Sequence, residues 1–343
     1  MNESEDLYLS IVVSSRNDNH GGDMRKRMTI FINGLIYQCN KYKLPAEIVF
    51  VDWNSPNEDD LLFDVLPKPS PEDYLRIRYI VVPENEHAKF QYSDKIPLFQ
   101  MIAKNVGIRR SKAPFVLCTN VDLLFSDELF EILAKRSLEE GKFYRANRSD
   151  IPNDIDSKSS VANQLIFCKN NVLKVLGKDR RFPIIRNDDG FLMRNKIFTP
   201  LIYPISWLKR IIAGKDTVVH RLDLDACGDF TLMSKSDWIK IDGYAELEMY
   251  SIHIDSMGLM AASALGIEQV LLPKKACAYH ISHTGGWEFA NPFEKLRFFE
   301  NKPCLDWRSV WSAGMELNKT KSNFDINDEN WGLNDVILKE IKA

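Results

Sequence analysis

Residues 113 to 125 read APFVLCTNVDLLF, an apolar run that is interrupted once by the polar cluster Thr119-Asn120-Val121-Asp122. Such a run is typical of a buried central strand, and its polar end predicts that Asp122 lies at the carboxyl edge of a sheet. Ligands of open α/β sheets bind at this edge. The alternative interpretation is a strand followed by a solvent-exposed turn, and the segment alone does not decide between the two.

The residues around this segment alternate between strand patterns and helix patterns. Apolar residues recur at helical spacing in two segments, and β-rich runs separate them. Ser126 can cap a further helix, with Asp127 and Glu128 in its first turn. Strands are predicted at Leu7 to Val13, Glu47 to Val51 and Arg76 to Val82, and helices at Met24 to Tyr42 and Ile96 to Arg110. This alternation predicts an α/β fold with a mixed, mainly parallel sheet flanked by helices.

The second half of the chain is less regular. A loop is predicted at Arg148 to Ser160, strands at Gln164 to Cys168, Cys227 to Ser234, Gln269 to Leu272 and Ala276 to His280, and helices at Asn170 to Leu176, Ser236 to Ile241, Ile254 to Leu265 and Trp331 to Ile341. The segment from Arg180 to Arg221 mixes basic residues with Pro, Gly and aromatics. It suits a helix docked on the sheet, an acceptor-binding subdomain, a membrane-surface helix, or a basic lid that uses some of Arg186, Arg194, Lys215 and Arg221.

Parallel strands end at one edge of their sheet, so the loops after Val13, Val51 and Thr119 should meet. Their polar residues are Asn17, Asp18, Asp52 and Asp122. None of these loops contains a GxGxxG or Walker A motif, which argues against dinucleotide oxidoreductases, common methyltransferases and P-loop kinases. The pattern leaves nucleotide binding through side chains and a metal ion.

The composition is that of an ordinary globular protein. The chain has 343 residues, of which 45% are hydrophobic and 27% are charged, and a net charge of -3 gives no general reason to expect a nucleic acid partner. Its six cysteines are scattered without a CxxC pair, as expected for reduced thiols in a cytosolic protein. The acidic N-terminus and the lack of a long apolar run predict a cytoplasmic location, with peripheral membrane contact left open.

Five segments in order carry a resemblance to a known family. They read IVVSSRNDN, EIVFVDWNSP, NVGIRRSKAPFVLCTNVDLLFS, GDFTLMSKSDWIKIDGYAE and HIDSMGLMAASALG. Together they resemble the GT-A glycosyltransferases, most closely the family-2-like inverting enzymes, and RNDNHGG is similar to the opening of a little-characterised branch. The resemblance implies a GT-A (Rossmann-like) catalytic domain at residues 1–290 and a helical C-terminal extension at 291–343 packed on it. The nucleotide-sugar half would span about 1–125 and the acceptor half about 126–290.

The resemblance also implies roles for individual residues. Asp255 matches the general base that activates the acceptor. Asp122 stands in the DxD-like motif and would bind a divalent metal, with one of His280 and His283 as a further ligand. Residues implied at the nucleotide are Ser14, Ser15, Arg16, Asn17, Asp52, Asn105 and Asn120.

Two positions depart from the family pattern. Asn120 replaces the first carboxylate of the DxD motif. The residue pair around Asp255 lacks the supporting carboxylate, which is either absent or supplied from elsewhere, with Glu246 and Glu248 as the candidates.

The implied reaction moves a sugar from a nucleoside-diphosphate sugar donor to a hydroxyl of a glycan or lipid-linked acceptor, with inversion. Asp255 would take the proton in a direct displacement, and Mn²⁺ or Mg²⁺ would neutralise the leaving diphosphate. An acceptor of this class suits polysaccharide biosynthesis. Two alternatives stay open: a nucleotidyltransferase, and a non-catalytic GT-A-like module that binds a nucleotide-sugar or a glycan.

Overall fold

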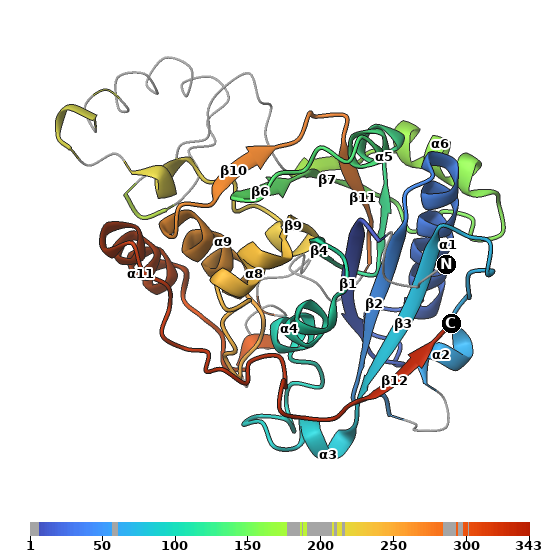
Figure 1. Cartoon of the computed structure of the whole chain (residues 1–343), viewed down its shortest axis with the longest axis horizontal. Helices are drawn as coiled ribbons and strands as arrows, with labels where there is room; N and C mark the ends of the chain where they lie inside the picture. The colour runs from blue at the N-terminus through green and yellow to red at the C-terminus, as the bar shows by residue number, and fades with distance from the viewer. Residues whose placement is uncertain are drawn as a thin grey trace.

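The computed structural model describes residues 7–56, 61–176, 186, 188–190, 208, 211–214, 217–283, 293, 298–300 and 302–343. At its centre is an eight-stranded mixed sheet with the strand order β10-β6-β9-β4-β1-β2-β3-β12, covered by helices on both faces (Figure 1). The four central strands β4, β1, β2 and β3 are parallel to one another. The predicted α/β class, with a mixed and mainly parallel sheet flanked by helices, is confirmed.

The strands of this sheet are β1 (Leu9–Ser15), β2 (Ala46–Trp53), β3 (Leu75–Val82), β4 (Phe115–Thr119), β6 (Lys142–Arg145), β9 (Phe230–Ser234), β10 (Glu268–Leu271) and β12 (Lys339–Lys342). The helices whose bounds lie within the described residues are α1 (Met24–Tyr42), α2 (Leu62–Val65), α3 (Glu84–His87), α4 (Gln100–Arg110), α5 (Asp127–Ala134), α6 (Val161–Asn170), α8 (Lys235–Lys240), α9 (Ile254–Ala264) and α11 (Trp307–Thr320), with 3-10 turns η1 (Val218–Arg221) and η2 (Cys227–Asp229). Among the described residues, no helix is long and apolar enough to cross a membrane.

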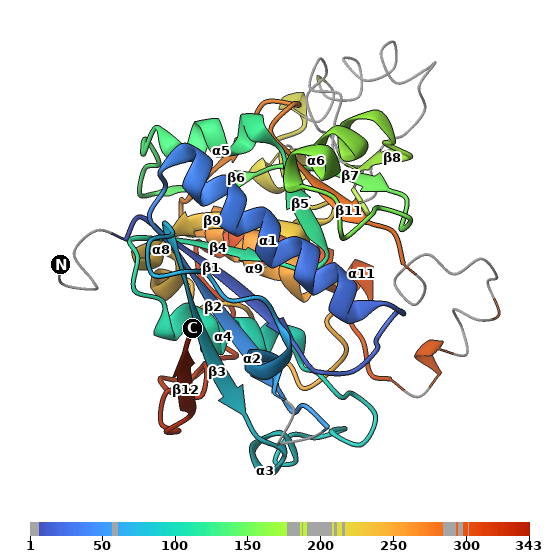
Figure 2. The same cartoon turned by 90° about the vertical axis from the view of Figure 1, so that its right-hand side faces the viewer.

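Each central strand is buried on both sides because successive side chains enter different cores. On β1, Val12 packs in one core with α4, α9 and α11, whereas Ile11 and Val13 pack in another core with α1 and α5. Figure 2 shows α1 crossing one face of the sheet. Covered faces explain why β1 and β2 read as continuous apolar runs rather than as alternating patterns.

A second, four-stranded sheet has the order β5-β11-β7-β8. Its strands are β5 (Leu123–Phe125), β7 (Asn147–Ile151), β8 (Lys174–Leu176) and β11 (Cys277–Ile281). β11 lies between β5, to which it is antiparallel, and β7, to which it is parallel. Because β5 follows β4 after only three residues, this small sheet brings β11 and β7 beside the carboxyl edge of the large one.

Three predictions between residues 148 and 176 are wrong. The expected loop at 148–160 begins with β7, and the expected helix at 170–176 contains β8, which pairs with β7. The expected strand at 164–168 belongs to α6, whose N-terminus is capped by the Ser160 hydroxyl. Gln164, Leu165 and Cys168 are the buried residues of α6, a helical spacing that a short apolar run did not reveal.

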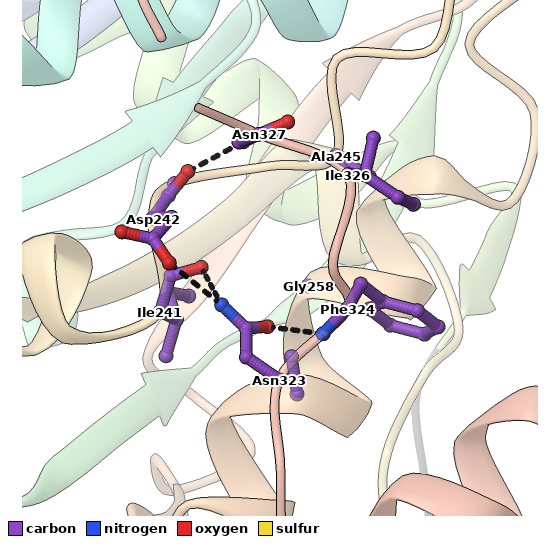
Figure 3. Close-up of a pocket in the computed structure, with 10 residues that line it drawn as sticks. Ile241, Asp242, Ala245, Gly258, Asn323, Phe324, Ile326 and Asn327 are labelled. Carbon is purple, nitrogen blue, oxygen red and sulfur yellow. Dashed lines mark hydrogen bonds between the residues drawn. The ribbon is translucent and has the colours of Figure 1, made fainter. Parts of the chain in front are cut away.

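In the described part of the C-terminal segment, α11 is a helix, but the predicted helix at 331–341 is wrong. Gly332 and Leu333 have positive φ values of 71° and 51°, which end any right-handed helix at this point. β12 instead pairs with the edge strand β3. Ahead of it, Asn323 and Asn327 tie the chain to the turn at Asp242 (Figure 3).

Candidate active site

A carboxylate and two imidazoles meet at the carboxyl edge of the large sheet. The Nε2 atoms of His283 and His280 lie 3.1 Å and 3.6 Å from Asp122 Oδ2. Each of the three side chains offers one possible ligand atom, and these three atoms all lie within 4.8 Å of one another. Only one of the two histidines was expected to bind beside Asp122, and both lie next to it.

Strand pairing explains why residues so distant in sequence meet here. Asp122 lies in the turn between β4 and β5, and its carbonyl accepts a hydrogen bond from the Ile281 amide at 3.0 Å. His280 is on β11, within the strand predicted at 276–280, and His283 follows the end of that strand. The cluster is therefore fixed by backbone pairing rather than by flexible side chains.

The electrostatics of the cluster favour an ionised Asp122. Burial would raise the pKa of Asp122, but His280 and His283 hold it well below its ordinary value. Burial would likewise lower the pKa of His280, whereas Asp122 and Asp150 raise it to about 9. Asp122 Oδ1 is buried and has no hydrogen-bond partner. An unsatisfied buried carboxylate oxygen beside two imidazoles fits a divalent cation.

A chain of charged residues runs from His280 into the protein. The Nδ1 atom of His280 is 3.1 Å from Asp150 Oδ1, which also accepts a hydrogen bond from Arg148 Nε at 2.6 Å. Arg148 Nη1 donates to Asp229 Oδ2 at 3.1 Å. Arg148, Asp150 and Asp229 are not among the site residues predicted from the sequence.

Asn120 occupies the other end of this chain. Its amide nitrogen donates to Asp229 Oδ1 at 2.6 Å, and its oxygen accepts from the ammonium of Lys104 at 3.0 Å. Lys104 is fully buried and also donates to the Gly228 carbonyl at 2.9 Å. The first position of the DxD-like motif therefore holds the amide of Asn120 instead of a carboxylate. The carboxylate of Asp229 is hydrogen-bonded to this amide.

Asp255 lies in the first turn of α9, on the other side of Gly228. Its Oδ1 accepts a hydrogen bond from the Ser256 amide at 2.8 Å, and its Oδ2 is 3.1 Å from the point that a Cβ on Gly228 would occupy. Its charge also acts on Lys104. The 3-10 turn η2 thus lies between the two groups of residues. Its Gly228 is next to Asp255, the predicted base, and its Asp229 is hydrogen-bonded to Arg148.

The predicted nucleotide residues divide into two groups. Ser14 and Ser15 end β1, and both hydroxyls are buried without a hydrogen-bond partner. Arg16 pairs with Asp18 at 3.1 Å, and the Asn17 amide donates to Ser55 Oγ at 2.8 Å. These four residues lie at the carboxyl edge, as predicted.

Asp52 and Asn105 have structural partners instead. Asp52 accepts hydrogen bonds from the Ser55 hydroxyl and from the Leu62 amide, so its carboxylate holds the loop after β2. Asn105 is fully buried and is hydrogen-bonded to Tyr244 and Glu246, so its side chain is not among those that gather at the edge.

The loop that leads into α1 is held beside the cluster by Arg27, which sequence analysis also missed. Its guanidinium donates to the carbonyls of His20, Gly21 and Gly22, the last at 2.6 Å, and it interacts electrostatically with Asp122. Gly21 and Gly22 have positive φ values of 69° and 73°, which explains the two glycines of the segment RNDNHGG.

Part of the proposed basic lid lies outside the described residues, namely Arg194 and Lys215. Arg186 is buried and donates to the carbonyls of Gly190 and Leu222 and to Asp225. Arg221 is exposed at the end of η1. Of the four basic residues considered for the lid, Arg186 therefore has a structural role, because its guanidinium holds neighbouring segments of the chain.

The chain matches no protein-family model, and no curated protein is similar to it in sequence. Two crystal structures of S. aureus TarS, residues 1–349, are similar to it in fold, one of them in complex with UDP-GlcNAc. Both are 12% identical, with TM-scores of 0.42 and 0.43, and the matches cover 92% of this chain and 71% and 74% of the TarS chains. A likeness this distant carries no argument about activity.

Proposed function

We propose that the chain is a GT-A-type glycosyltransferase that transfers a sugar from a nucleoside-diphosphate sugar to an acceptor hydroxyl. The observation that carries the proposal is the Asp122–His280–His283 cluster at the carboxyl edge of the sheet, where ligands of α/β folds bind. In this proposal the nucleotide-sugar half spans about 1–125 and the acceptor half about 126–290.

The cluster suits Mn²⁺ better than Mg²⁺. Mg²⁺ prefers oxygen ligands and keeps most of its water, whereas imidazole nitrogen suits the transition metals. Two imidazoles and one carboxylate would hold the ion, and the bound cation would neutralise the negative charge that develops on the leaving diphosphate. Ser14 and Ser15, with free hydroxyls at the same edge, are the residues that would meet the nucleotide.

Asp255 would be the general base. The acceptor oxygen forms a bond to the anomeric carbon, the bond from that carbon to the diphosphate oxygen breaks, and the hydroxyl proton passes to Asp255 Oδ2. Its other oxygen is held by the Ser256 amide, which fixes the carboxylate in the first turn of α9. A single displacement of this kind inverts the anomeric configuration. The supporting carboxylate is not Glu246, whose Oε1 accepts hydrogen bonds from Asn105 and the Gly332 amide.

Turnover of sugar nucleotides tests the proposal. Purified protein with Mn²⁺ should release nucleoside diphosphate from at least one donor in a panel of sugar nucleotides and acceptors. Asp255→Asn should abolish transfer while donor binding persists, because the substitution removes only the proton acceptor. Asp122→Ala should weaken Mn²⁺-dependent donor binding, measured by thermal shift with and without Mn²⁺.

Two results would count against this assignment. Release of no nucleoside diphosphate from any donor would contradict the enzymatic reading and favour a binding module. Loss of donor binding in Asp255→Asn with normal binding in Asp122→Ala would mean that the two carboxylates have the opposite roles.

A further inference from the structure

We propose that Asp150 and Arg148, on β7, are positioning residues that orient His280 toward the divalent cation. The inference rests on the cation site proposed above and assigns residues outside it. Neither side chain would touch the ion or the substrate. Both act through the imidazole of His280.

The two nitrogens of His280 face different partners. Nδ1 is 3.1 Å from Asp150 Oδ1, and Nε2 is directed to Asp122 Oδ2 at 3.6 Å. A neutral imidazole that donates its Nδ1–H to a carboxylate keeps the Nε2 lone pair for a metal ion. Asp150 therefore selects the tautomer in which His280 presents Nε2 to the site.

Backbone pairing fixes this contact. His280 on β11 is the register partner of Asp150 on the parallel strand β7, and of Leu123 on the antiparallel strand β5. The carboxylate is thus placed on one side of the imidazole, and Asp122, next to Leu123, on the other. Asp150 and His280 are both buried, so water competes weakly for the hydrogen bond.

Arg148 holds Asp150 and connects it to the DxD-like segment. Its guanidinium bridges Asp150 Oδ1 and Asp229 Oδ2, and Asp229 Oδ1 accepts a hydrogen bond from the amide of Asn120. Without Arg148 the two buried carboxylates would repel each other. Arg148 therefore keeps Asp150 ionised and fixed. Asn120 extends the same series of hydrogen bonds through its contact with Asp229.

Calorimetric titration with Mn²⁺ tests the inference without any sugar donor. Asp150→Ala should bind Mn²⁺ about 10- to 100-fold more weakly than the wild type, the usual effect of removing such a partner of a metal-binding histidine. Asp150→Asn should lose less affinity, because its amide oxygen still accepts from Nδ1–H. Asp150→Asn also keeps the side-chain volume, so it provides the test where Asp150→Ala does not fold.

A double-substitution cycle shows whether Asp150 acts through His280. Asp150→Ala/His280→Ala should bind Mn²⁺ no more weakly than His280→Ala alone, because the positioning residue has nothing left to position. Additive losses would overturn the inference. So would unchanged Mn²⁺ affinity in Asp150→Ala or, if that variant is unfolded, in Asp150→Asn.

Glu47→Gln is the matched control. Glu47 is as buried as Asp150 and is paired with an arginine, Arg78, at 2.9 Å, but it lies at the amino end of β2, away from the site. It should change thermal stability and leave the Mn²⁺ affinity unchanged. Equal loss of affinity in Glu47→Gln would mean that any buried ion pair has this effect, which overturns the inference.

The outcomes also separate the inference from the proposed function. A wild type that binds Mn²⁺, binds it more weakly in His280→Ala and binds it with unchanged affinity in Asp150→Ala overturns the inference alone. A wild type that binds no Mn²⁺ overturns both the inference and the proposed cation site.

Discussion

Gly228 is the residue on which the position of Asp255 depends most directly. Its Cβ, if present, would lie 3.1 Å from Asp255 Oδ2, closer than an ordinary contact. Gly228→Ala should therefore displace the carboxylate by a few tenths of an ångström. We expect the turnover number to fall about tenfold or more, because small misplacements of a reacting group are costly, while the midpoint of thermal unfolding changes little.

Donor affinity provides the control for this substitution. Mn²⁺-dependent donor binding should be retained in Gly228→Ala, because the cluster at Asp122 does not contact Gly228. A variant with wild-type turnover would contradict the role of Asp255 as the base, since a displaced base cannot act at full rate.

Glu246 should make stability depend on pH. Burial raises the pKa of Glu246 from 4.5 to about 7, although hydrogen bonds from Asn105 and Gly332 act in the opposite direction. The folded protein therefore keeps a proton that the unfolded chain has already released. The contribution of Glu246 to the free energy of unfolding falls as the pH rises from about 4.5 through about 7.

Glu246→Gln should remove this dependence, because glutamine offers the same acceptor without a charge. We expect the variant to gain on the order of 1–3 kcal/mol relative to the wild type between pH 5 and pH 8. Urea unfolding at both pH values measures the difference, and other titrating groups cancel in it. A constant difference between the two proteins would contradict the raised pKa.

Among single residues, the sequence pattern pointed to side chains at or near the ends of strands, such as Asp122, and missed Arg148 and Asp150, which lie within β7. Asp122 was predictable because a polar residue ends an apolar run. Arg148 and Asp150 were read as part of a loop, and they reach the site only because β7 pairs with β11, about 130 residues later. No local pattern encodes that pairing, although Arg148 and Asp150 at alternate positions of a strand must share a face.

At the scale of elements, Ser126 links a helix to the strand that carries His280. Its hydroxyl caps α5 by accepting from the Leu129 amide, accepts from the Cys277 amide at 3.0 Å, and donates to the Lys275 carbonyl at 2.8 Å. Ser126→Ala should cost about 2–3 kcal/mol of unfolding free energy, because it removes a cap and leaves the buried Cys277 amide and the Lys275 carbonyl without this partner.

Ser160→Ala is the matched comparison. Ser160 also caps a helix, α6, but it is exposed, and its hydroxyl accepts a hydrogen bond from the Asn163 amide at 3.3 Å. Its loss should cost about 1 kcal/mol, as for a simple cap. Urea unfolding of both variants measures the difference. Equal costs would show that the contacts of Ser126 with residues 275 and 277 add nothing.

Elements were predictable where a long periodic pattern decided between helix and strand. The predicted bounds of α1 coincide with the observed helix over its 19 residues, because its apolar positions repeat over five turns. The short run at 164–168 fits a strand and a helix equally well, and tertiary contacts decide for the helix. The same ambiguity explains β8, which exists only because β7 offers it an edge.

At the scale of the whole molecule, the last residues of the chain are bound to the centre of the fold. Arg110, at the end of α4, donates to the carbonyls of Gly332, Leu333 and Val336, and the Arg109 guanidinium lies 3.9 Å from the centre of the Trp331 ring. β12 then adds a strand to the edge of the large sheet (Figure 1). The path of the C-terminal segment could not be predicted from the sequence. Arg110 holds it through backbone carbonyls, which every residue has, so the contacts leave no recognisable sequence pattern.

Arg110→Ala should therefore destabilise the whole protein rather than one end of it. The substitution leaves three carbonyls without their partner, and we expect a loss of about 2–4 kcal/mol in urea unfolding. Arg76→Ala is the control, because Arg76 also donates to carbonyls, those of Pro71, Asp73 and Leu75, but all of them lie within five residues of it in the sequence. It should cost less than about 1 kcal/mol. If the C-terminal segment were an independent appendage, Arg110→Ala would make residues 321–343 sensitive to protease while the unfolding midpoint stayed that of the wild type.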